Sequence, residues 1–302
     1  MKKVVGLGAC VFDTLISCPR YADEDTKLAA TDVFTAAGGP VGNALVVMSG
    51  LGVSARLIGS LGGDNAAEYI INDFHKQGVS TDGAVTISGA RSFTSYILLS
   101  ESKKTRTCVF DRGTVPDDPE NVDLGEIDGA AALHLDGNYL QSALAAAKYA
   151  RSKGVKVSLD AGGLYDGIEQ LLPLVDILIP SAEFAKGITG KSDAASALLA
   201  LRQRYAPEIL VVTDGSAGGY YYDGKEVRSY DSFKVQAVDT NGAGDTFHGA
   251  FIARCIDGAG VAECCTFASA AAAIKCSKRG VRGIFSGKDD VEEFIKARIC
   301  AR

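Results

Sequence analysis

The sequence lacks the features of a membrane-spanning or nucleic-acid-binding protein. It has no tryptophan, only two methionines, and no apolar run near the roughly 20 residues of a transmembrane helix. Acidic residues outnumber basic ones, 37 against 31, which gives a net charge of −6 and an isoelectric point near 5.2. No stripe of lysine and arginine is present, although such stripes are the main means of binding phosphate backbones. We therefore expect neither a nucleic-acid partner nor a membrane.

Cysteine and histidine are not arranged as metal ligands or as a disulfide framework. No C-x-x-C pair occurs, and none of the three histidines lies at metal-binding spacing. No secretory leader precedes the first apolar run at residues 3–7, so a reducing cytoplasm is the expected location. Most thiols are expected to behave as small core side chains. The cysteines are Cys10, Cys18, Cys108, Cys255, Cys264, Cys265, Cys276 and Cys300.

What the sequence does contain is an alternation of apolar β-type runs with helical stretches. The runs at 131–135, 156–159 and 176–179 alternate with helical patterns such as 141–153. This repeat predicts an α/β fold with a parallel sheet covered by helices on both faces. Polar residues follow each run, at the sheet edge where such folds bind ligands. These residues are Asp136, Gly137 and Asn138, then Asp160, then Ser181 and Glu183.

The most informative stretch is VDTNGAGDTFHGAF at 238–251, a glycine turn that opens a helix. Gly242, Ala243 and Gly244 leave backbone amides free to converge on an anion at the positive end of the helix. Asp245 follows at the mouth of this turn, where a carboxylate can accept the proton of a hydroxyl that attacks phosphorus. The alternative is that Asp245 only stabilises the helix dipole while the glycines serve the turn.

Two glycine motifs of well-known binding loops are incomplete. The stretch GLGACVFD has Val11 where a dinucleotide fingerprint needs its third glycine. The GKS at 190–192 has Ala185 where a phosphate-binding P-loop needs its first glycine. The first strand instead delivers Asp13 to its C-terminal edge, either as a ligand for sugar hydroxyls or as a turn residue.

The string DTNGAGDTF at 239–247 resembles the C-terminal signature of the PfkB family of carbohydrate kinases. AAGGPVGNA at 36–44 resembles the N-terminal signature of the family, and the stretches TRTCVFDR, LHLDGN and FHGAF look closest to its ketohexokinase-like and sulfofructose-kinase-like members. The resemblance implies a ribokinase-like three-layer sandwich with a mainly parallel sheet and a small β-sheet lid. It implies one kinase domain over 1–302, with lid insertions at about 14–37 and 91–112.

The family signatures also imply roles for individual residues. Asp245 would be the catalytic base, with Gly242, Ala243 and Gly244 as the anion hole. The sugar would contact Asp13, Gly38, Gly39, Asn43, Asn138 and Asp245. ATP would contact Ser181, Thr213, Gly215, Gly218, Gly242, Gly244 and Ser269. Simple alternatives exist for several of them: Asn43 as a helix cap, Asn138 as a turn residue, Gly215 and Gly218 as a hairpin, and Ser269 as an incidental serine.

The sequence departs from the family in the region expected to contact the metal. Many members carry N-x-x-E here, whereas this chain has Ser181 and Phe184 at those places and Glu183 one position early. Glu183 is therefore only a weak candidate for Mg²⁺ contact through water. Asp239, together with a glycine-bearing loop at 278–286, resembles a monovalent-cation loop, which makes K⁺ a further candidate cofactor.

The sequence thus predicts an ATP- and Mg²⁺-dependent kinase for a terminal hydroxymethyl of a small sugar, with a ketose or furanose favoured. The 136–140 segment carries no basic residue, which favours a neutral sugar. Arg106 and Arg112 are expected on a charged lid face, from which one of them could reach a sugar or phosphate. A homodimer through the lid is expected, because an uncovered small sheet exposes edges and apolar faces.

Two alternatives remain at the level of sequence. A nucleoside kinase of the same fold would need an aromatic slot, for which Phe34, Phe93, Tyr96 and Phe110 are candidates. A non-catalytic sugar sensor would agree with the missing N-x-x-E but would have no need of Asp245 as a base.

Overall fold

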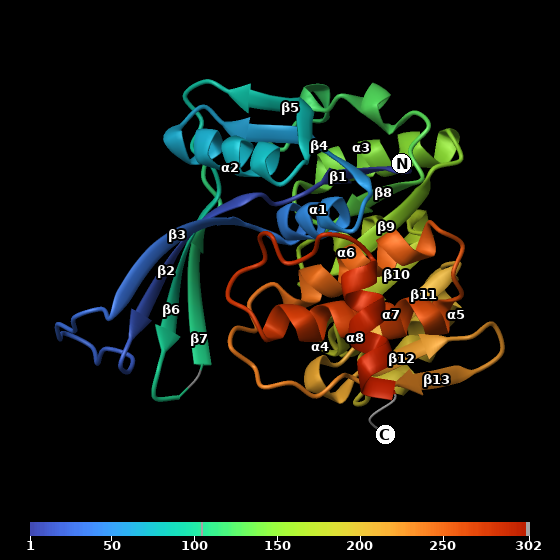
Figure 1. The fold of residues 1–302 in the computed structure, drawn as a ribbon. Helices are drawn as coiled ribbons and strands as arrows, with labels where there is room; N and C mark the ends of the chain where they lie inside the picture. The colour runs from blue at the N-terminus through green and yellow to red at the C-terminus, as the bar shows by residue number, and fades with distance from the viewer. Residues whose placement is uncertain (104, 300–302) are drawn as a thin grey trace.

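The computed structural model describes residues 1–103 and 105–299 and contains a large, mainly parallel sheet (Figure 1). Its strand order is β13-β12-β11-β10-β9-β8-β1-β4-β5, in which only the pairs β11–β12 and β12–β13 are antiparallel. The strands are β1 (Lys3–Leu7), β4 (Ser54–Gly62), β5 (Ser80–Ile87), β8 (Ala132–Leu135), β9 (Lys156–Ala161), β10 (Ile177–Pro180), β11 (Ile209–Thr213), β12 (Gly219–Tyr222) and β13 (Val227–Tyr230).

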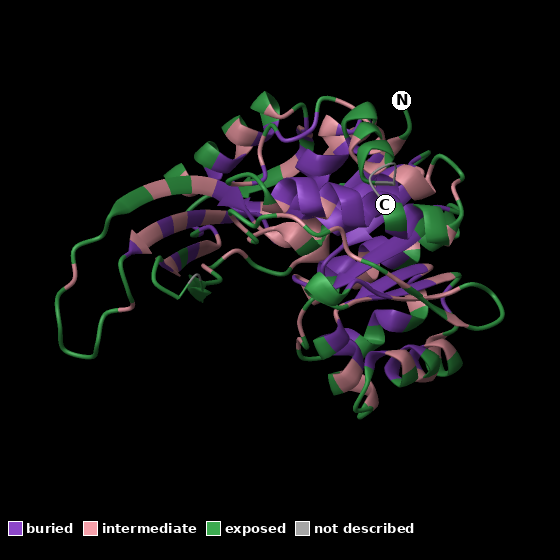
Figure 2. Ribbon diagram, turned by 60° about the horizontal axis from the view of Figure 1, so that its bottom comes forward, coloured by how far each residue is buried: buried purple, intermediate pink, exposed green. Residues whose placement is uncertain are grey.

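Helices cover both faces of this sheet, as the alternating pattern predicts. The central strands β8 and β10 are buried at every position, because side chains on both of their faces meet helices (Figure 2). One face packs against α1 (Pro40–Gly50), α2 (Asn65–Lys76), α6 (Ala243–Cys255), α7 (Val261–Cys276) and α8 (Asp289–Ile299). The other face packs against α3 (Leu140–Ser152), α4 (Ala182–Thr189) and α5 (Ala194–Tyr205). The result is the predicted three-layer α/β sandwich.

Short 3₁₀ turns connect several of these elements. They lie at Pro119–Asn121, Leu124–Ile127, Ile168–Gln170, Leu172–Leu174 and Gly215–Ala217.

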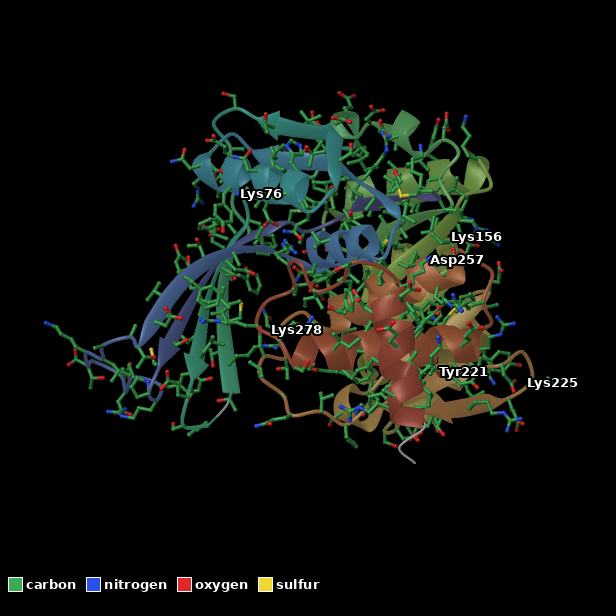
Figure 3. The ribbon with its side chains drawn as sticks, in the orientation of Figure 1. Lys76, Lys156, Tyr221, Lys225, Asp257 and Lys278 are labelled. Atoms are coloured by element: carbon green, nitrogen blue, oxygen red, sulfur yellow. The ribbon has the colours of Figure 1, made fainter. Side chains whose placement is uncertain are left out.

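Charged side chains such as Lys156 and Lys225 lie on the outside of the molecule (Figure 3).

A second sheet of four strands projects from the body of the molecule (Figure 1). Its order is β3-β2-β6-β7, with β2 and β6 parallel and the other pairs antiparallel. The strands are β2 (Val11–Cys18), β3 (Asp32–Gly38), β6 (Thr94–Ser100) and β7 (Thr105–Asp111). We call this sheet the lid. It begins at Val11, before the predicted insertion at about 14–37, whereas β6 and β7 both fall within the predicted insertion at about 91–112.

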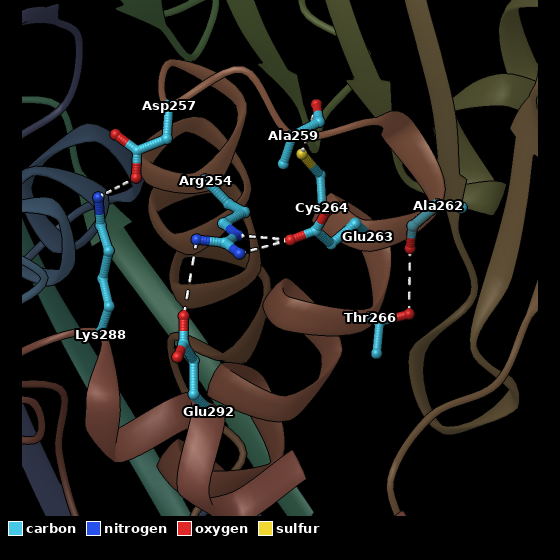
Figure 4. Close-up of polar contacts among 9 residues, drawn as sticks. All are labelled: Arg254, Asp257, Ala259, Ala262, Glu263, Cys264, Thr266, Lys288 and Glu292. Carbon is cyan, nitrogen blue, oxygen red and sulfur yellow. Dashed lines mark hydrogen bonds and ion pairs between the residues drawn. The ribbon is translucent and has the colours of Figure 1, made fainter. Parts of the chain in front are cut away.

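The C-terminal helix is tied to the helices that support the site (Figure 4). Arg254 of α6 donates to Glu263 of α7, with Nε to Oε1 at 3.0 Å, and its Nη1 lies 3.6 Å from Glu292 of α8. Lys288, just before α8, pairs with Asp257. Surface ion pairs of this kind each contribute little. They add to the apolar packing of Phe247, Phe251 and Ile252, which holds α6, the helix whose first turn carries the candidate base, in the core.

The remaining sequence expectations for the fold concern thiols and membrane segments. Within the described residues, Cys10, Cys18, Cys264 and Cys265 are buried free thiols, whereas Cys108 is exposed on the lid. Cys300 lies outside the described residues. No helix in the described part of the chain has the length and apolar character needed to cross a membrane.

Candidate active site

A cavity of about 550 Å³ lies between the lid and the C-terminal ends of the central strands. It brings together residues from sequence positions more than 200 apart, among them Asp13 and Asp245. Of the predicted site residues, those on its lining are Asp13, Gly39, Asn43, Asn138, Ser181, Thr213, Gly242, Ala243, Gly244 and Asp245.

Asp245 lies in the first turn of α6, half-buried, with its carboxylate facing the cavity. The Asn43 side-chain amide donates a hydrogen bond to Asp245 Oδ2 at 2.6 Å. Burial raises the pKa of Asp245 to about 6, and the nearby Asp160 and Asp136 carboxylates add to this rise, while the Asn43 hydrogen bond opposes it. The group is therefore ionised at neutral pH yet basic enough to accept a proton, as general-base catalysis requires.

The turn before Asp245 has the geometry of an anion-binding site. Gly242 caps α6 with a φ of +75°, and a Cβ at this position would lie 2.4 Å from Val281 Cγ2. Gly244 has no atom within 4 Å of the place where a Cβ would stand. The first amides of a helix have no partner within the helix. The Ala243 amide donates to the Thr240 carbonyl oxygen at 3.3 Å, so the amides of Gly242 and Gly244 on the cavity lining are those available to an anion.

Asp13 lies on the opposite side of the cavity, within β2 of the lid and not at the end of β1 as the sequence suggested. Ser95 Oγ of the neighbouring strand β6 donates to Asp13 Oδ1 at 2.6 Å. Burial raises the pKa of Asp13 to about 6, against the effect of the Ser95 hydrogen bond. The Asp13 carboxylate can accept hydrogen bonds from a diol.

Gly38 and Gly39 must both be glycine, because other atoms of the protein lie where a Cβ would stand. A Cβ on Gly38 would lie 2.0 Å from Asp13 Oδ2, so only glycine leaves room for this carboxylate. Gly38 is not itself on the cavity lining. Gly39 has a φ of +90°, and a Cβ there would lie 2.2 Å from the Ala9 carbonyl oxygen. This turn aims α1, and with it Asn43, at Asp245.

Asn138 is held between the main sheet and the lid. Its backbone amide donates to Asp136 Oδ1 at 2.9 Å, and its side-chain oxygen accepts from Arg112 Nη1 at 2.8 Å. The Arg112 guanidinium lies 5.3 to 5.8 Å from the ring centroids of Phe93, Phe110 and Tyr165. Sequence reasoning left this arginine on a charged lid face, because nothing in the chain order connects residue 112 to residue 138.

Residues expected on the ATP side fall into two groups. Thr213 and Ser181 line the cavity and form a β-bridge with each other, and Ser181 also caps α4 by accepting from the Phe184 amide. Gly215 and Gly218 are not on the lining. A Cβ on Gly218 would lie 2.0 Å from the Tyr230 carbonyl oxygen, so the hairpin itself requires this glycine, and its contact with ATP stays a prediction.

The structure separates three other candidates from the cavity lining. Ser269 is buried within α7. Glu183 is exposed in the first turn of α4. Asp239 is hydrogen-bonded to its own loop and to Lys275. Among the described residues, no group of three or more histidine, cysteine, aspartate or glutamate side chains could hold a metal ion.

Sequence reasoning did not identify a buried pair beneath Asp245. His248 Nε2, one turn further along α6, lies 3.2 Å from Asp160 Oδ1. Burial opposes ionisation of Asp160, but the imidazoles of His248 and His134 lower its pKa overall. Asp160 thus adds negative charge below the candidate base. The signals in the sequence were Asp160 at a strand end and the histidine of the FHGAF stretch.

Comparison with known proteins identifies the class as carbohydrate kinases. Residues 1–286 match the family model described as pfkB family carbohydrate kinase, and the chain belongs to that family. The ribokinase of Haemophilus influenzae is 27% identical, covering 98% of this chain and 99% of its own length. The ATP-dependent ribose-1-phosphate kinase of Halopiger xanaduensis is 26% identical, covering 99% of both chains.

Solved structures give the same architecture. A provisionally assigned ribokinase from Agrobacterium tumefaciens superposes with a TM-score of 0.89 at 28% identity, over 99% of this chain and 98% of its own. The Arabidopsis thaliana ribokinase complexed with ribose and ATP gives a TM-score of 0.85 at 24% identity, over 98% and 99%. The family match and these relatives establish an ATP-dependent carbohydrate kinase.

Proposed function

We propose that this kinase transfers the γ-phosphoryl group of ATP to a terminal hydroxymethyl of a small sugar, with Asp245 as general base. One observation carries the proposal: the Asp245 carboxylate, held by Asn43 at 2.6 Å, faces the same cavity as the glycine turn and Asp13. A base, an anion-binding turn and a diol acceptor are the groups that phosphoryl transfer to a sugar hydroxyl needs.

In this mechanism the sugar is oriented by Asp13, Asn43 and Asn138, which places one primary hydroxyl beside Asp245. Asp245 accepts the hydroxyl proton as the oxygen attacks the γ-phosphorus in line, and the bond to the ADP oxygen breaks. The amides of the turn at Gly242–Gly244 hold the negative charge of the transferred phosphoryl group. Mg²⁺, which would arrive with ATP, would supply further positive charge at the phosphates.

ATP is proposed to lie on the side of the cavity formed by Thr213, Ser181 and the glycine turn. These residues lie together on the cavity lining, and Arg106 Nη1 lies 3.4 Å from Thr240 Oγ1 just before the turn. The lid brings Arg106 and Arg112 over the cavity from β7 and its end. Lid closure would exclude water and limit hydrolysis of ATP.

The charge of the sugar is the finer part of the proposal. The preference for a neutral sugar rested on the absence of a basic residue at 136–140, but the lid places the Arg112 guanidinium 2.8 Å from Asn138. Among the described residues, Arg112 has no carboxylate partner. A ketose or furanose remains the favoured class, and Arg112 favours one with an acidic substituent as a second candidate.

The nucleoside alternative finds less support in the aromatic residues. Phe93 and Phe110 lie against each other with centroids 5.6 Å apart, and Arg112 lies over both rings. Arg279 lies 3.9 Å from the centroid of Phe34. Three of the four candidate rings thus already lie against guanidinium groups, and the fourth, Tyr96, is exposed on the lid.

A homodimer through the lid is a further part of the proposal. Strand β7 is exposed along its whole length, and Val33, Tyr96, Val109 and Phe110 are large apolar side chains exposed on the lid. Sedimentation equilibrium of Val109→Glu should give the monomer mass where the unmodified protein gives the dimer. Leu199→Glu, an exposed apolar position on α5, is the matched control. A monomeric unmodified protein would contradict this part.

We also propose that the enzyme acts in the cytoplasm.

The decisive experiment is ADP release with Mg·ATP against ketoses, aldopentoses, sugar acids, sugar phosphates and nucleosides, run beside Asp245→Asn. Turnover on one sugar that collapses in Asp245→Asn would support both the reaction and the base. Turnover on nucleosides would favour the nucleoside kinase. If sugar and ATP bind but ADP release stays at background, the non-catalytic sensor is the correct function.

A further inference from the structure

Lys275 is a buried ammonium in the last turn of α7. Its side chain has no solvent exposure, and its Nζ donates to the Asp239 backbone oxygen at 2.7 Å. The same Nζ lies 3.1 Å from Asp239 Oδ2. A buried ammonium is costly unless it is paired and hydrogen-bonded, so this contact is required for the local fold.

Asp239 connects this ammonium to both loops of the site. Its Oδ1 accepts from the Asn241 amide at 2.8 Å, which fixes the segment entering the glycine turn. Its Oδ2 accepts from the Gly280 amide at 2.9 Å, which fixes the 278–283 loop. The charge of Lys275 therefore stabilises a carboxylate on which two separate segments depend.

The 278–283 loop in turn reaches the candidate base. Val281 lies directly against Gly242, where an added Cβ would meet it at 2.4 Å. Arg282 Nη1 donates to the Asn43 side-chain oxygen at 2.8 Å, and the amide of the same Asn43 donates to Asp245 at 2.6 Å. Lys275 is thus linked by short polar contacts to the anion hole and to Asp245, although it contacts neither.

The residues around Asp239 do not fit an additional monovalent cation. A cation there would need the Asp239 carboxylate and backbone carbonyls as ligands, and the Lys275 ammonium already binds one of each. Arg106, beside Thr240, adds a second positive charge nearby. A K⁺ ion at this place would meet like charge on two sides, and its main ligands are occupied.

We propose that Lys275 is a built-in cation that holds the 239–244 turn and the 278–283 loop in place, so that this enzyme has no K⁺ requirement. Lys275 is a positioning residue that acts through Asp239. This inference rests on the proposed function where turnover is the readout, but thermal melting tests it separately.

The first test compares the unmodified enzyme in KCl, NH₄Cl and choline chloride at equal ionic strength. The melting temperature, the kcat and the KM for ATP should be unchanged among the three salts. A melting temperature or a kcat that rises with K⁺ and not with choline would overturn the inference. If no sugar is phosphorylated, the proposed function fails while the melting comparison still decides the role of Lys275.

The second test uses two substitutions that differ in the space they leave. Lys275→Ala vacates the ammonium position, so its melting temperature and kcat should fall in choline chloride and recover in part with K⁺ or NH₄⁺, as expected for ligand binding to the folded state. Lys275→Met fills the same space, so it should lose kcat without recovery. Lys148→Ala, at an exposed position on α3, is the control. A Lys275→Ala enzyme that is fully active in choline, or impaired without recovery in any salt, would overturn the inference. If Lys275→Ala does not fold, the Lys275→Met enzyme and the salt comparison decide.

Discussion

The Asn43 side chain joins Arg282 to Asp245. Its oxygen accepts from Arg282 Nη1 at 2.8 Å and its amide donates to Asp245 Oδ2 at 2.6 Å. The Arg282 Nε is in turn held by Asp73 at 2.6 Å. Because Arg282 fixes the amide orientation, the carboxylate of Asp245 receives a donor and keeps its other oxygen for the substrate hydroxyl. This relationship leads directly to predictions about the base.

Replacing Asp245 by Asn should lower kcat sharply while stabilising the fold. Loss of a general base lowers kcat by about 10²- to 10⁴-fold. Since burial holds the pKa of Asp245 at about 6, an ionised carboxylate destabilises the folded state at neutral pH. Partial exposure screens this cost, so relief of about 1 kcal/mol is expected. Calorimetry at pH 7.5 should show a higher melting temperature for Asp245→Asn. Glu293→Gln, exposed on α8, is the control and should change neither property.

The pH dependence of the reaction should carry an acid limb near pH 6. Asp13 and Asp245 both have pKa values raised to about 6, and both must be ionised to act. The kcat/KM should therefore rise with pH to a plateau above about pH 6. Ser95→Ala removes a hydrogen bond that lowers the pKa of Asp13, so its acid limb should move to higher pH. If the acid limb of kcat/KM has the same midpoint in Ser95→Ala, the ionisation of Asp13 does not contribute to the pH dependence.

The raised pKa of Asp245 also gives the direction in which the stability of the fold changes with pH. The folded pKa of Asp245 lies above its ordinary value of 3.8, so the folded state binds the proton more tightly than the unfolded chain. The associated stability is fully present below pH 3.8 and is lost as the pH rises through about 6. The melting temperature difference between Asp245→Asn and the unmodified protein should therefore widen as the pH rises from 5 to 7, with the substituted protein the more stable. A constant difference would contradict the raised pKa.

Two glycines of the anion-binding turn should respond oppositely to alanine. Gly242→Ala places a Cβ 2.4 Å from Val281 Cγ2 at a φ of +75°, and should lower the free energy of unfolding by about 1–3 kcal/mol. Gly244→Ala meets no atom within 4 Å, so the fold should be unaffected. Its methyl group would occupy space beside the transferred phosphoryl group, lowering kcat/KM by about tenfold or more. Chemical denaturation and steady-state kinetics separate the two effects. Equal melting and equal kinetics for both substitutions would contradict this assignment of the turn.

Arg112 should decide whether a charged or a neutral sugar is preferred. With Arg112→Ala, an acidic substrate should lose about 10- to 100-fold in kcat/KM, the scale of one charge-assisted hydrogen bond, while a neutral sugar loses little. Arg112→Lys keeps the charge but not the planar geometry, so it should recover only part of the loss. Equal losses for neutral and acidic sugars would show that Arg112 serves the lid alone. Arg91→Ala, at an exposed lid arginine paired with Asp111, is the control.

The sequence predicted the elements of the fold, and it supplied the residues of the proposed base and anion-binding turn, because both depend on local patterns. Runs of apolar residues alternating with helical stretches give a covered parallel sheet, and Gly242 to Asp245 form one continuous turn whose chemistry lies within a few residues. Asp13 does lie on the cavity lining, and its contact with a sugar stays a prediction, but its strand was misplaced, because β2 becomes a strand only through pairing with β3 and β6.

What only the tertiary structure decided is which distant side chains meet. Arg112 donates a hydrogen bond to Asn138, Lys275 to Asp239, and His248 pairs with Asp160. In sequence these partners are 26, 36 and 88 positions apart. Nothing in local periodicity encodes these distances, since they follow from the order of strands and the docking of the lid. The same packing separates Ser269, Gly215 and Gly218 from the cavity lining, because motif spacing fixes a turn but not the direction it faces. The sequence by itself thus determined the glycine turn at 242–245 and the covered parallel sheet. Long-range packing decided which charged side chains surround the cavity.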